Sequence, residues 1–301
     1  MHIIETNNLS HTYGRRTEAV RSLTLSIPQG SACALLGQNG AGKTTTLKML
    51  MNLLRPTSGS ATVLGVDSRK LAPAQFQQIG YISENQKLPA GMTVRRFLDF
   101  CRALYPAWDK QLETRLLALF DLPPERKLAH LSRGMRMKAT LLSSLAYRPK
   151  LIVMDEPFSG LDPVVREELT QGVLELANTG DWTLLISSHD IDDVERLIDN
   201  VAIIEAGKLL LHETLDSLQT RFRRVSASFN QESAQLALPH SCIACENAAA
   251  RAVWVETAFT AQTEPAYREA NPGVSFTIQS MSLKEIYLAT VKNTATRKGN
   301  N

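Results

Sequence analysis

Apolar residues form two kinds of pattern in the first two thirds of this chain. Short uninterrupted apolar runs occupy Ala32 to Leu36, Leu151 to Met154 and the start of TLLISSHD, Thr183 to Asp190. Such runs are typical of parallel strands that are covered on both faces. Another segment places its apolar residues at helical spacing after Lys43, namely Leu47, Leu50, Met51 and Leu54. These patterns predict an α/β fold built on a parallel sheet.

Further patterns outline the elements around that sheet. A β-rich opening runs through Ser26, and a helix-rich subdomain covers about 93–146, with breaks at its prolines. Helices are also expected over Leu71 to Gln78, from Pro163, and in IDDVERLID, where Ile191, Val194, Leu197 and Ile198 share an apolar face. Two strands about Ala206-Gly207 close this first domain, predicted as residues 1–220.

The pattern changes after Arg221. FRRVSASF, AVWVETAFT and VSFTIQ alternate as half-buried strands do, and MSLKEIYLATVK reads as an amphipathic helix. We expect a small α+β domain over 221–301, with a disordered tail from Thr296. A role in regulation or dimer support and a passive extension are both compatible with this appendage.

The segment GQNGAGKTT, Gly37 to Thr45, lies between the first apolar run and the helix that begins near Lys43. Its glycines allow consecutive backbone N–H groups to point at phosphate oxygens, next to the positive end of a helix. Lys43 would reach the β and γ phosphates, and the Thr44 hydroxyl would bind Mg²⁺. The segment therefore predicts a nucleoside triphosphate site.

Carboxylates follow the second apolar run. Asp155 and Glu156 stand where LIVM ends, and ligands of parallel sheets gather at the carboxyl ends of the strands. We expect Asp155 beside Mg²⁺, and Glu156 to polarise a water for attack on the γ phosphate. His189 ends the third run in the same way, which favours a contact with the γ phosphate.

Together these segments resemble the ATP-binding subunit of an ABC (ATP-binding cassette) transporter, over residues 3 to 214. The resemblance implies a P-loop NTPase fold, with a RecA-like core, a β-rich N-terminal part and the helical subdomain. It implies that Glu156 is the catalytic glutamate, His189 the switch histidine, and Asp162 part of the D-loop. Tyr13 resembles the aromatic residue that stacks on adenine. The ATP-binding residues would then be Tyr13, Gly37, Asn39, Gly40, Gly42, Lys43, Thr44 and Thr45.

LSRGM, Leu131 to Met135, is similar to the family signature LSGGQ, which closes over the ATP held by a second subunit. Ser132 and Gly134 are kept, whereas Arg133 replaces a glycine and Met135 a glutamine. Ser132 can cap a helix and meet a γ phosphate, and Gly134 allows close approach. Arg133 adds a cation near phosphate. LSRGMRMK is similar to signatures of the ABC-2 branch, whose members mostly export drugs, peptides, lipids or polysaccharides.

A second departure lies in IGYISENQ, Ile79 to Gln86. Where the family has a glutamine that ligates Mg²⁺, this chain has Glu84, which is an equally acceptable oxygen ligand. The predicted metal ligands are thus Thr44, Glu84 and Asp155, with Gln86 as the rival to Glu84. Leu88 to Phe97 is the candidate surface for the membrane subunit.

Composition restricts the partners. The chain has 301 residues, and its net charge of +3 comes from 33 basic and 30 acidic side chains, too balanced to indicate a nucleic-acid partner. We recognise no secretory signal and no apolar run long enough to span a bilayer, so the pore is expected in another chain. Four cysteines favour a reducing compartment, and Cys242-Ile-Ala-Cys245 is interpreted as two ordinary cysteines.

The function expected from the sequence is Mg²⁺-dependent ATP hydrolysis that powers export through a separate membrane permease. The partners would be that permease and a second ATP-binding subunit, either a copy or a paralogue, at the cytoplasmic face of the membrane. One alternative is a soluble ABC-type ATPase that acts on ribosomes or DNA. Another is a nucleotide-gated regulatory switch, which would be expected to lack Glu156 or His189. The residues that contact the cargo are expected on the permease.

Overall fold

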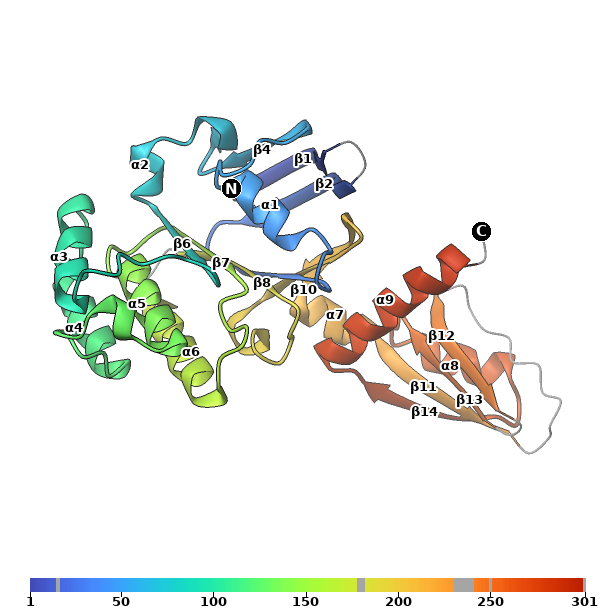
Figure 1. The fold of residues 1–301 in the computed structure, drawn as a ribbon. Helices are drawn as coiled ribbons and strands as arrows, with labels where there is room; N and C mark the ends of the chain where they lie inside the picture. Colours follow the sequence, from blue (N-terminus) through green and yellow to red (C-terminus); the bar gives the residue numbers. More distant parts are fainter. Residues whose placement is uncertain (15–16, 178–181, 230–240, 249–250, 300–301) are drawn as a thin grey trace. The chain divides into compact units, whose positions relative to one another are not determined.

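The computed structural model describes residues 1–14, 17–177, 182–229, 241–248 and 251–299, and these form two compact units (Figure 1). The first unit is Met1–His212 and the second is Glu213–Asn301. The sequence placed the boundary after residue 220, so the observed division comes a few residues earlier, within the last strand of the first unit. Each unit is described by itself below.

The first unit opens with a small antiparallel sheet in the order β2-β1-β4-β5. Its strands are β1 (His2–Tyr13), β2 (Thr17–Pro28), β4 (Ser58–Val63) and β5 (Val66–Asp67). Ile4, Leu9 and Leu25 are buried, while polar neighbours along the same strands face outward. The strands β1 and β2 are the β-rich opening that the sequence predicts, whereas β4 and β5 were not predicted.

The second sheet has the order β10-β9-β3-β8-β7-β6. It comprises β3 (Ala32–Leu36), β6 (Ile79–Ser83), β7 (Leu151–Asp155), β8 (Thr183–Ser188), β9 (Asn200–Glu205) and β10 (Lys208–Thr214). Every residue of β7 and β8 is buried. Five neighbouring strands, β9, β3, β8, β7 and β6, pair in parallel. Their carboxyl ends therefore meet at one edge, where α1 (Lys43–Leu50) begins.

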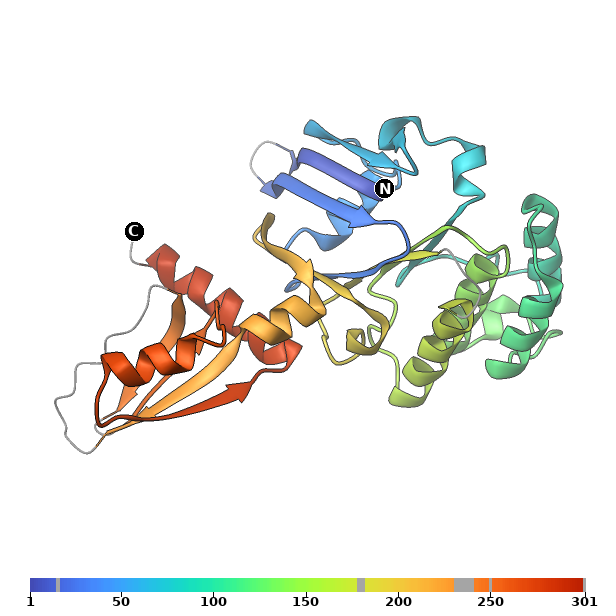
Figure 2. The same ribbon diagram turned by 180° about the vertical axis from the view of Figure 1, so that it is seen from behind.

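Helices surround one end of this sheet (Figures 1 and 2). They are α3 (Val94–Leu104), α4 (Lys110–Leu119), α5 (Arg133–Leu145) and α6 (Pro163–Ala177), with the 3₁₀ turn η2 (Leu128–His130). The 3₁₀ turn η1 (Ser68–Lys70) contacts β4 and α1, and the short helix α2 (Pro73–Phe76) precedes β6. Side chains of Thr93, Asp109 and Ser132 cap α3, α4 and α5 at their N-termini. The helical subdomain thus lies where the sequence predicts it.

IDDVERLID differs from its expected helix, because only the 3₁₀ turn η3 (Glu195–Leu197) forms there. Its four apolar residues are nevertheless buried. A short 3₁₀ turn with irregular flanks therefore directs the same four side chains into the core as the expected helix would.

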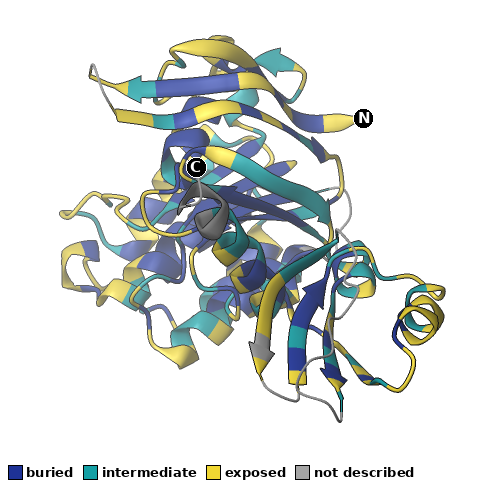
Figure 3. Cartoon of the chain, turned by 90° about the vertical axis from the view of Figure 1, so that its right-hand side faces the viewer, coloured by how far each residue is buried: buried dark blue, intermediate teal, exposed yellow. Residues whose placement is uncertain are grey.

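The second unit is an antiparallel sheet in the order β12-β13-β11-β14, with helices α8 and α9 on its two faces (Figures 1 and 2). The strands are β11 (Arg223–Ser228), β12 (Cys242–Ala248), β13 (Arg251–Glu256) and β14 (Ser275–Ser280), and the helices are α7 (Leu215–Arg221), α8 (Thr263–Ala270) and α9 (Leu283–Gly299). One face packs Val225, Trp254 and Phe276 against Tyr267 of α8. The buried stripe along these strands is dark blue in Figure 3.

The second unit therefore has three elements, α7, β12 and α8, that the sequence patterns did not indicate. In addition, α9 continues to Gly299 where a disordered tail from Thr296 was expected. Asn300 and Asn301 lie outside the described residues.

Candidate functional site

The predicted phosphate loop joins β3 to α1 and has a backbone that only glycine accommodates. Gly40 and Gly42 have φ of +83° and +108°. A Cβ at Gly42 would lie 2.4 Å from the carbonyl oxygen of Ala19, and a Cβ at Gly37 would lie 2.4 Å from that of Ile204. Since these positions have no room for a side chain, the loop keeps the shape in which its N–H groups can cradle an anion.

Lys43 folds back over this loop and is only 5% exposed. Its Nζ donates to the carbonyl oxygens of Gly37 and Gln38 at 2.6 and 3.1 Å, and lies 3.1 Å from Glu156 Oε1. The ammonium thus stands at the mouth of the loop, where it can meet phosphate oxygens.

Asp155, the last residue of β7, shares one carboxylate oxygen between two hydroxyls. Thr44 Oγ1 and Ser187 Oγ each donate to Oδ1 at 2.8 Å. Ser187 comes from β8, the strand beside β7, and its contact was not predicted. The resulting pair of a hydroxyl and a carboxylate is the kind of oxygen set that Mg²⁺ takes together with phosphate oxygens.

Glu156 follows at once and adopts a positive φ of 51°, which is uncommon for a side chain larger than glycine. Its N–H donates to Ser187 Oγ at 3.1 Å, which secures this turn. The two carboxylate oxygens face different partners, because Oε1 lies near Lys43 and Oε2 lies 2.8 Å from His189 Nδ1. Oε1 is buried, and among the described residues its one polar contact is the ion pair with Lys43. It can therefore accept a hydrogen bond from a ligand or a water molecule.

A pocket of about 370 Å³ opens over these groups. We call it the phosphate-loop pocket, and it is lined by Tyr13, Thr17, Ala19, Asn39, Gly40, Gly42, Lys43, Thr44, Thr45, Glu84 and Glu156. The structure therefore brings most of the predicted ATP-binding residues together. Thr17 and Ala19 were not predicted, because neither belongs to a recognisable motif.

Tyr13 stands at the rim of this pocket. Its hydroxyl lies 3.4 Å from Thr45 Oγ1, and the edge of the neighbouring His11 ring supports it. The side chain is 43% exposed, so part of the ring is available to a base.

The two candidates for the Mg²⁺-binding position after β6 differ in their surroundings. Glu84 lines the phosphate-loop pocket, whereas the amide oxygen of Gln86 accepts a hydrogen bond from Ser83 N at 3.4 Å. Glu84 is not free, because its Oε1 lies 2.6 Å from Arg133 Nη2.

The signature residues lie outside the lining of this pocket. Ser132 Oγ accepts from Met135 N at 3.2 Å and so caps α5. Gly134 packs beside Val165 of α6, since a Cβ there would lie 3.0 Å from that side chain. Asp162 caps α6 by accepting from Val165 N. Within one chain these three residues have structural contacts only, among those described.

Comparison with known proteins agrees with this geometry. The sequence model of the ABC transporter family matches residues 20–159. The bacitracin transport ATP-binding protein BcrA of Bacillus licheniformis is 34% identical over 224 residues, which are 74% of this chain and 73% of that protein. The chain belongs to the ATP-binding subunits of ABC transporters. Its activity is thus ATP hydrolysis coupled to transport, and the similarity to BcrA is consistent with the ABC-2 exporter branch.

Solved structures show the same cassette. The ATP-binding subunit of an ABC transporter, 28% identical, gives a TM-score of 0.65 and covers 72% of this chain and 92% of its own. The dimeric bacterial ABC transporter cassette MJ0796 gives a TM-score of 0.63 with 70% and 98% covered, and at 22% identity it supports the fold alone. Both agree with the predicted α/β cassette.

In the part of the chain that the structure describes, no helix is long and apolar enough to cross a bilayer. The same residues include no group of three or more His, Cys, Asp and Glu that could hold a metal. A metal in the cassette would therefore depend on the Thr44 hydroxyl and on phosphate oxygens besides its carboxylates.

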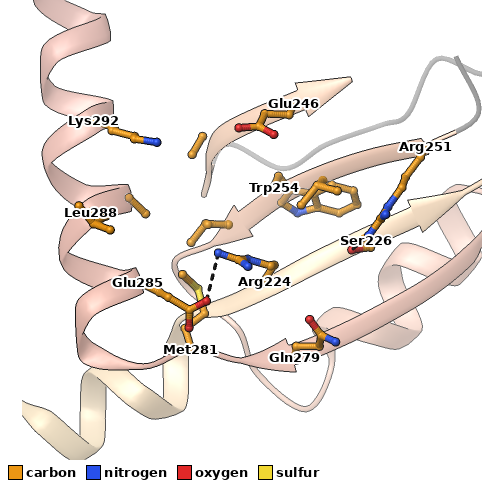
Figure 4. A pocket seen from close by; sticks show the side chains of 14 residues that line it. Arg224, Ser226, Glu246, Arg251, Trp254, Gln279, Met281, Glu285, Leu288 and Lys292 are labelled. Atoms are coloured by element: carbon orange, nitrogen blue, oxygen red, sulfur yellow. Dashed lines mark hydrogen bonds and ion pairs between the residues drawn. The ribbon is translucent and has the colours of Figure 1, made fainter. Parts of the chain in front are cut away.

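The second unit of the cassette protein has a pocket of its own, of about 390 Å³, between the open face of its sheet and α9 (Figure 4). Arg224 on the sheet and Glu285 on α9 form an ion pair at 3.2 Å in this pocket. The other charged residues that line it are Glu246, Arg251 and Lys292.

The two cysteines of the appendage sit on β12, where Ala244 has a positive φ of 51° and interrupts the register with β13. Burial and the nearby Glu256 carboxylate raise the pKa of the Cys242 thiol to about 12, so it stays protonated at neutral pH. Thiolate is the form that binds metals and exchanges disulfides. Cys242 therefore has the character of an ordinary, half-buried cysteine.

Proposed function

We propose that this cassette is the motor of an exporter, hydrolysing Mg²⁺-bound ATP and acting on a separate membrane permease. The observation that carries the proposal is the chain of contacts from Lys43 through Glu156 to His189 at the mouth of the phosphate loop. It joins a phosphate-binding cation and a largely buried carboxylate, which both line the phosphate-loop pocket, to an imidazole beside that pocket.

Each of these groups has a role in the attack of water on the γ phosphate. Glu156 is the general base or water-orienting residue, and its buried Oε1 is the oxygen that would accept the proton. His189 holds Oε2 and so fixes the orientation of the carboxylate. Lys43 moves from Glu156 to the phosphates as the nucleotide enters, since both attract the same ammonium.

Mg²⁺ would be held by Thr44, Asp155 and Glu84, and it would neutralise charge on the β and γ phosphates. The shared oxygen Asp155 Oδ1 and the Thr44 hydroxyl fit this ion, because both are hard oxygen ligands placed beside the phosphate loop. On the protein side, Ser187 orients Asp155 by donating to the same oxygen.

The active form we propose is a head-to-tail dimer, with a second copy or a paralogue. Ser132 and Gly134 do not line the pocket of their own chain, yet Ser132 offers a hydroxyl at the N-terminus of α5, which suits an anion. In such a dimer each signature would close over the ATP of the other subunit. MJ0796, which shares the fold, is a dimeric cassette.

The permease would place the subunit at the cytoplasmic face of the membrane, with Leu88 to Phe97 as its docking surface. Part of this segment begins α3, whose N-terminus Thr93 caps. Export, as opposed to import, is supported by the similarity to a bacitracin transport protein and by the LSRGMRMK signature.

The transport role can be tested by purifying tagged Glu156→Gln chain from detergent-solubilised membranes in the presence of Mg·ATP. We expect an integral membrane protein to co-purify in fixed stoichiometry, and the wild-type ATPase rate to change when the two are reconstituted in liposomes. A chain with Leu88 replaced by aspartate should lose the partner but keep its own ATPase activity. Recovery with ribosomes or nucleic acid, and no membrane protein, would support the soluble alternative instead.

A further inference from the structure

Two side chains that depart from the family pattern contact each other in this structure. Glu84 stands where the family has glutamine, and Arg133 stands where the signature has glycine. They are 49 positions apart in the sequence, and Arg133 Nη2 lies 2.6 Å from Glu84 Oε1. Neither departure alone would make this ion pair.

The loop after β7 contacts both members of the pair. Arg133 Nη2 also donates to the carbonyl oxygen of Ser159 at 2.6 Å, and Ser159 Oγ lies 3.3 Å from the same Glu84 oxygen. Next to it Gly160 has a φ of +63°, and a Cβ there would lie 2.9 Å from the guanidinium. The loops after β6 and β7 and the start of α5 therefore meet at one arginine.

Glu84 lies at the predicted nucleotide pocket, and one of its carboxylate oxygens is hydrogen-bonded to Arg133 and Ser159. Among the described residues, both side-chain hydrogen bonds of Glu84 go to Oε1, and the residue also lines the phosphate-loop pocket with Lys43 and Thr44. A bare carboxylate in this place would repel a triphosphate. A guanidinium, which stays charged at any physiological pH, removes most of that repulsion.

We propose that Arg133 is a positioning residue for Glu84 within its own subunit. It neutralises the carboxylate and holds Oε1, so that Glu84 can stand beside Mg·ATP without weakening nucleotide binding. This inference rests on the proposed function, because it assigns Glu84 to the metal side of that site. It gives Arg133 a task in its own chain, in place of a direct contact with the partner's phosphates.

The test measures nucleotide affinity rather than turnover. A fluorescent, non-hydrolysable ATP analogue is titrated with Mg²⁺ present, at protein concentrations where the chain elutes as a monomer. Arg133→Ala should weaken binding roughly fivefold, since the pair is part exposed and screened. Glu84→Gln should abolish this sensitivity, so that the double variant binds within about twofold of Glu84→Gln alone.

Two matched variants separate charge from folding. Arg136→Ala removes the next arginine of α5, which donates to the carbonyl oxygen of Leu131 and not to Glu84, and it should leave affinity unchanged. Arg133→Lys keeps the charge but cannot donate in two directions as guanidinium does, so an intermediate affinity is expected. Thermal unfolding midpoints confirm that each variant folds.

The outcomes distinguish this inference from the proposed function. If the parent chain does not bind the Mg²⁺-loaded analogue, the proposed function itself fails. If the parent binds but Arg133→Ala has the same effect in the parent as in the Glu84→Gln background, or no effect in either, the inference about Arg133 is wrong. An effect that emerges only in the dimer would assign Arg133 to the partner's site and overturn it as well.

Discussion

Replacing Glu156 with glutamine is expected to lower ATP turnover at least a hundredfold while leaving ATP affinity within about threefold, since general-base catalysis contributes 10² to 10⁴ in rate. The amide keeps the size of the carboxylate and its position between Lys43 and His189. It cannot accept the proton of the attacking water. Phosphate release and equilibrium binding of labelled ATP measure the two effects separately.

A suitable control is Glu175→Gln, which changes a surface glutamate of α6 paired with Arg115 at 3.4 Å. Its turnover should equal that of the wild type. If Glu156→Gln hydrolyses ATP at the wild-type rate, another group activates the water. If it loses ATP affinity instead, then Glu156 serves binding and its catalytic role is wrong.

Mixing two inactive variants is expected to restore activity. Lys43→Ala removes the cation of the phosphate loop, and Ser132→Arg blocks the signature, so each should reduce turnover of its own homodimer to a few per cent or less. In a mixed dimer both lesions fall on one composite site, and the other site is intact. An equimolar mixture should thus regain about a quarter of wild-type turnover, because half of its dimers hold one intact site of two.

Size-exclusion chromatography before and after mixing confirms that subunits exchange. Ser143→Ala, a change near the C-terminal end of the same helix α5, serves as the control, and this variant should be active without complementation. Activity that stays at the level of the two separate variants after exchange would mean that Ser132 acts within its own chain or not at all.

The sequence indicated which segments meet at the phosphate loop, because the constraints on these segments are local. The glycines of the phosphate loop and the acidic pair after an apolar run each fix a backbone shape at a known place in a parallel sheet. Glycine at 37 and 42 is required by contacts with Ile204 and Ala19, but the motif already implied a tight turn. Ser187 was missed, although its place at the end of an apolar run, two residues before His189, could have indicated it.

The sequence did not indicate elements whose apolar residues lack a regular spacing. In β12 the positive φ of Ala244 disrupts the alternation of side chains, so CIACENA does not read as a strand. In α8 only Tyr267 is buried, and a proline lies in its first turn, so no apolar stripe marks the helix. The last turns of α9 extend beyond the expected end of order, to Gly299.

Contacts across the fold are the features that no local pattern reveals. Glu84 and Arg133 were each recognised as departures from the family, and each was assigned a separate task at the nucleotide. Their ion pair depends on how the loop after β6 approaches the start of α5, which only the folded chain shows. The same holds for the ion pair of Lys43 with the carboxylate of Glu156, which no local pattern indicated.

Two copies of this chain are expected to form a dimer around two ATP molecules, and the dimer should separate after hydrolysis, which requires Glu156. The most direct measurement is light scattering on the Glu156→Gln chain after gel filtration with Mg·ATP, with bound nucleotide quantified in the same peak. The account predicts a dimer that holds one unhydrolysed ATP per subunit, and a monomer when ADP replaces ATP or when Ser132→Arg is added. A monomer that binds ATP fully, or a dimer of equal amount with ADP, would contradict it.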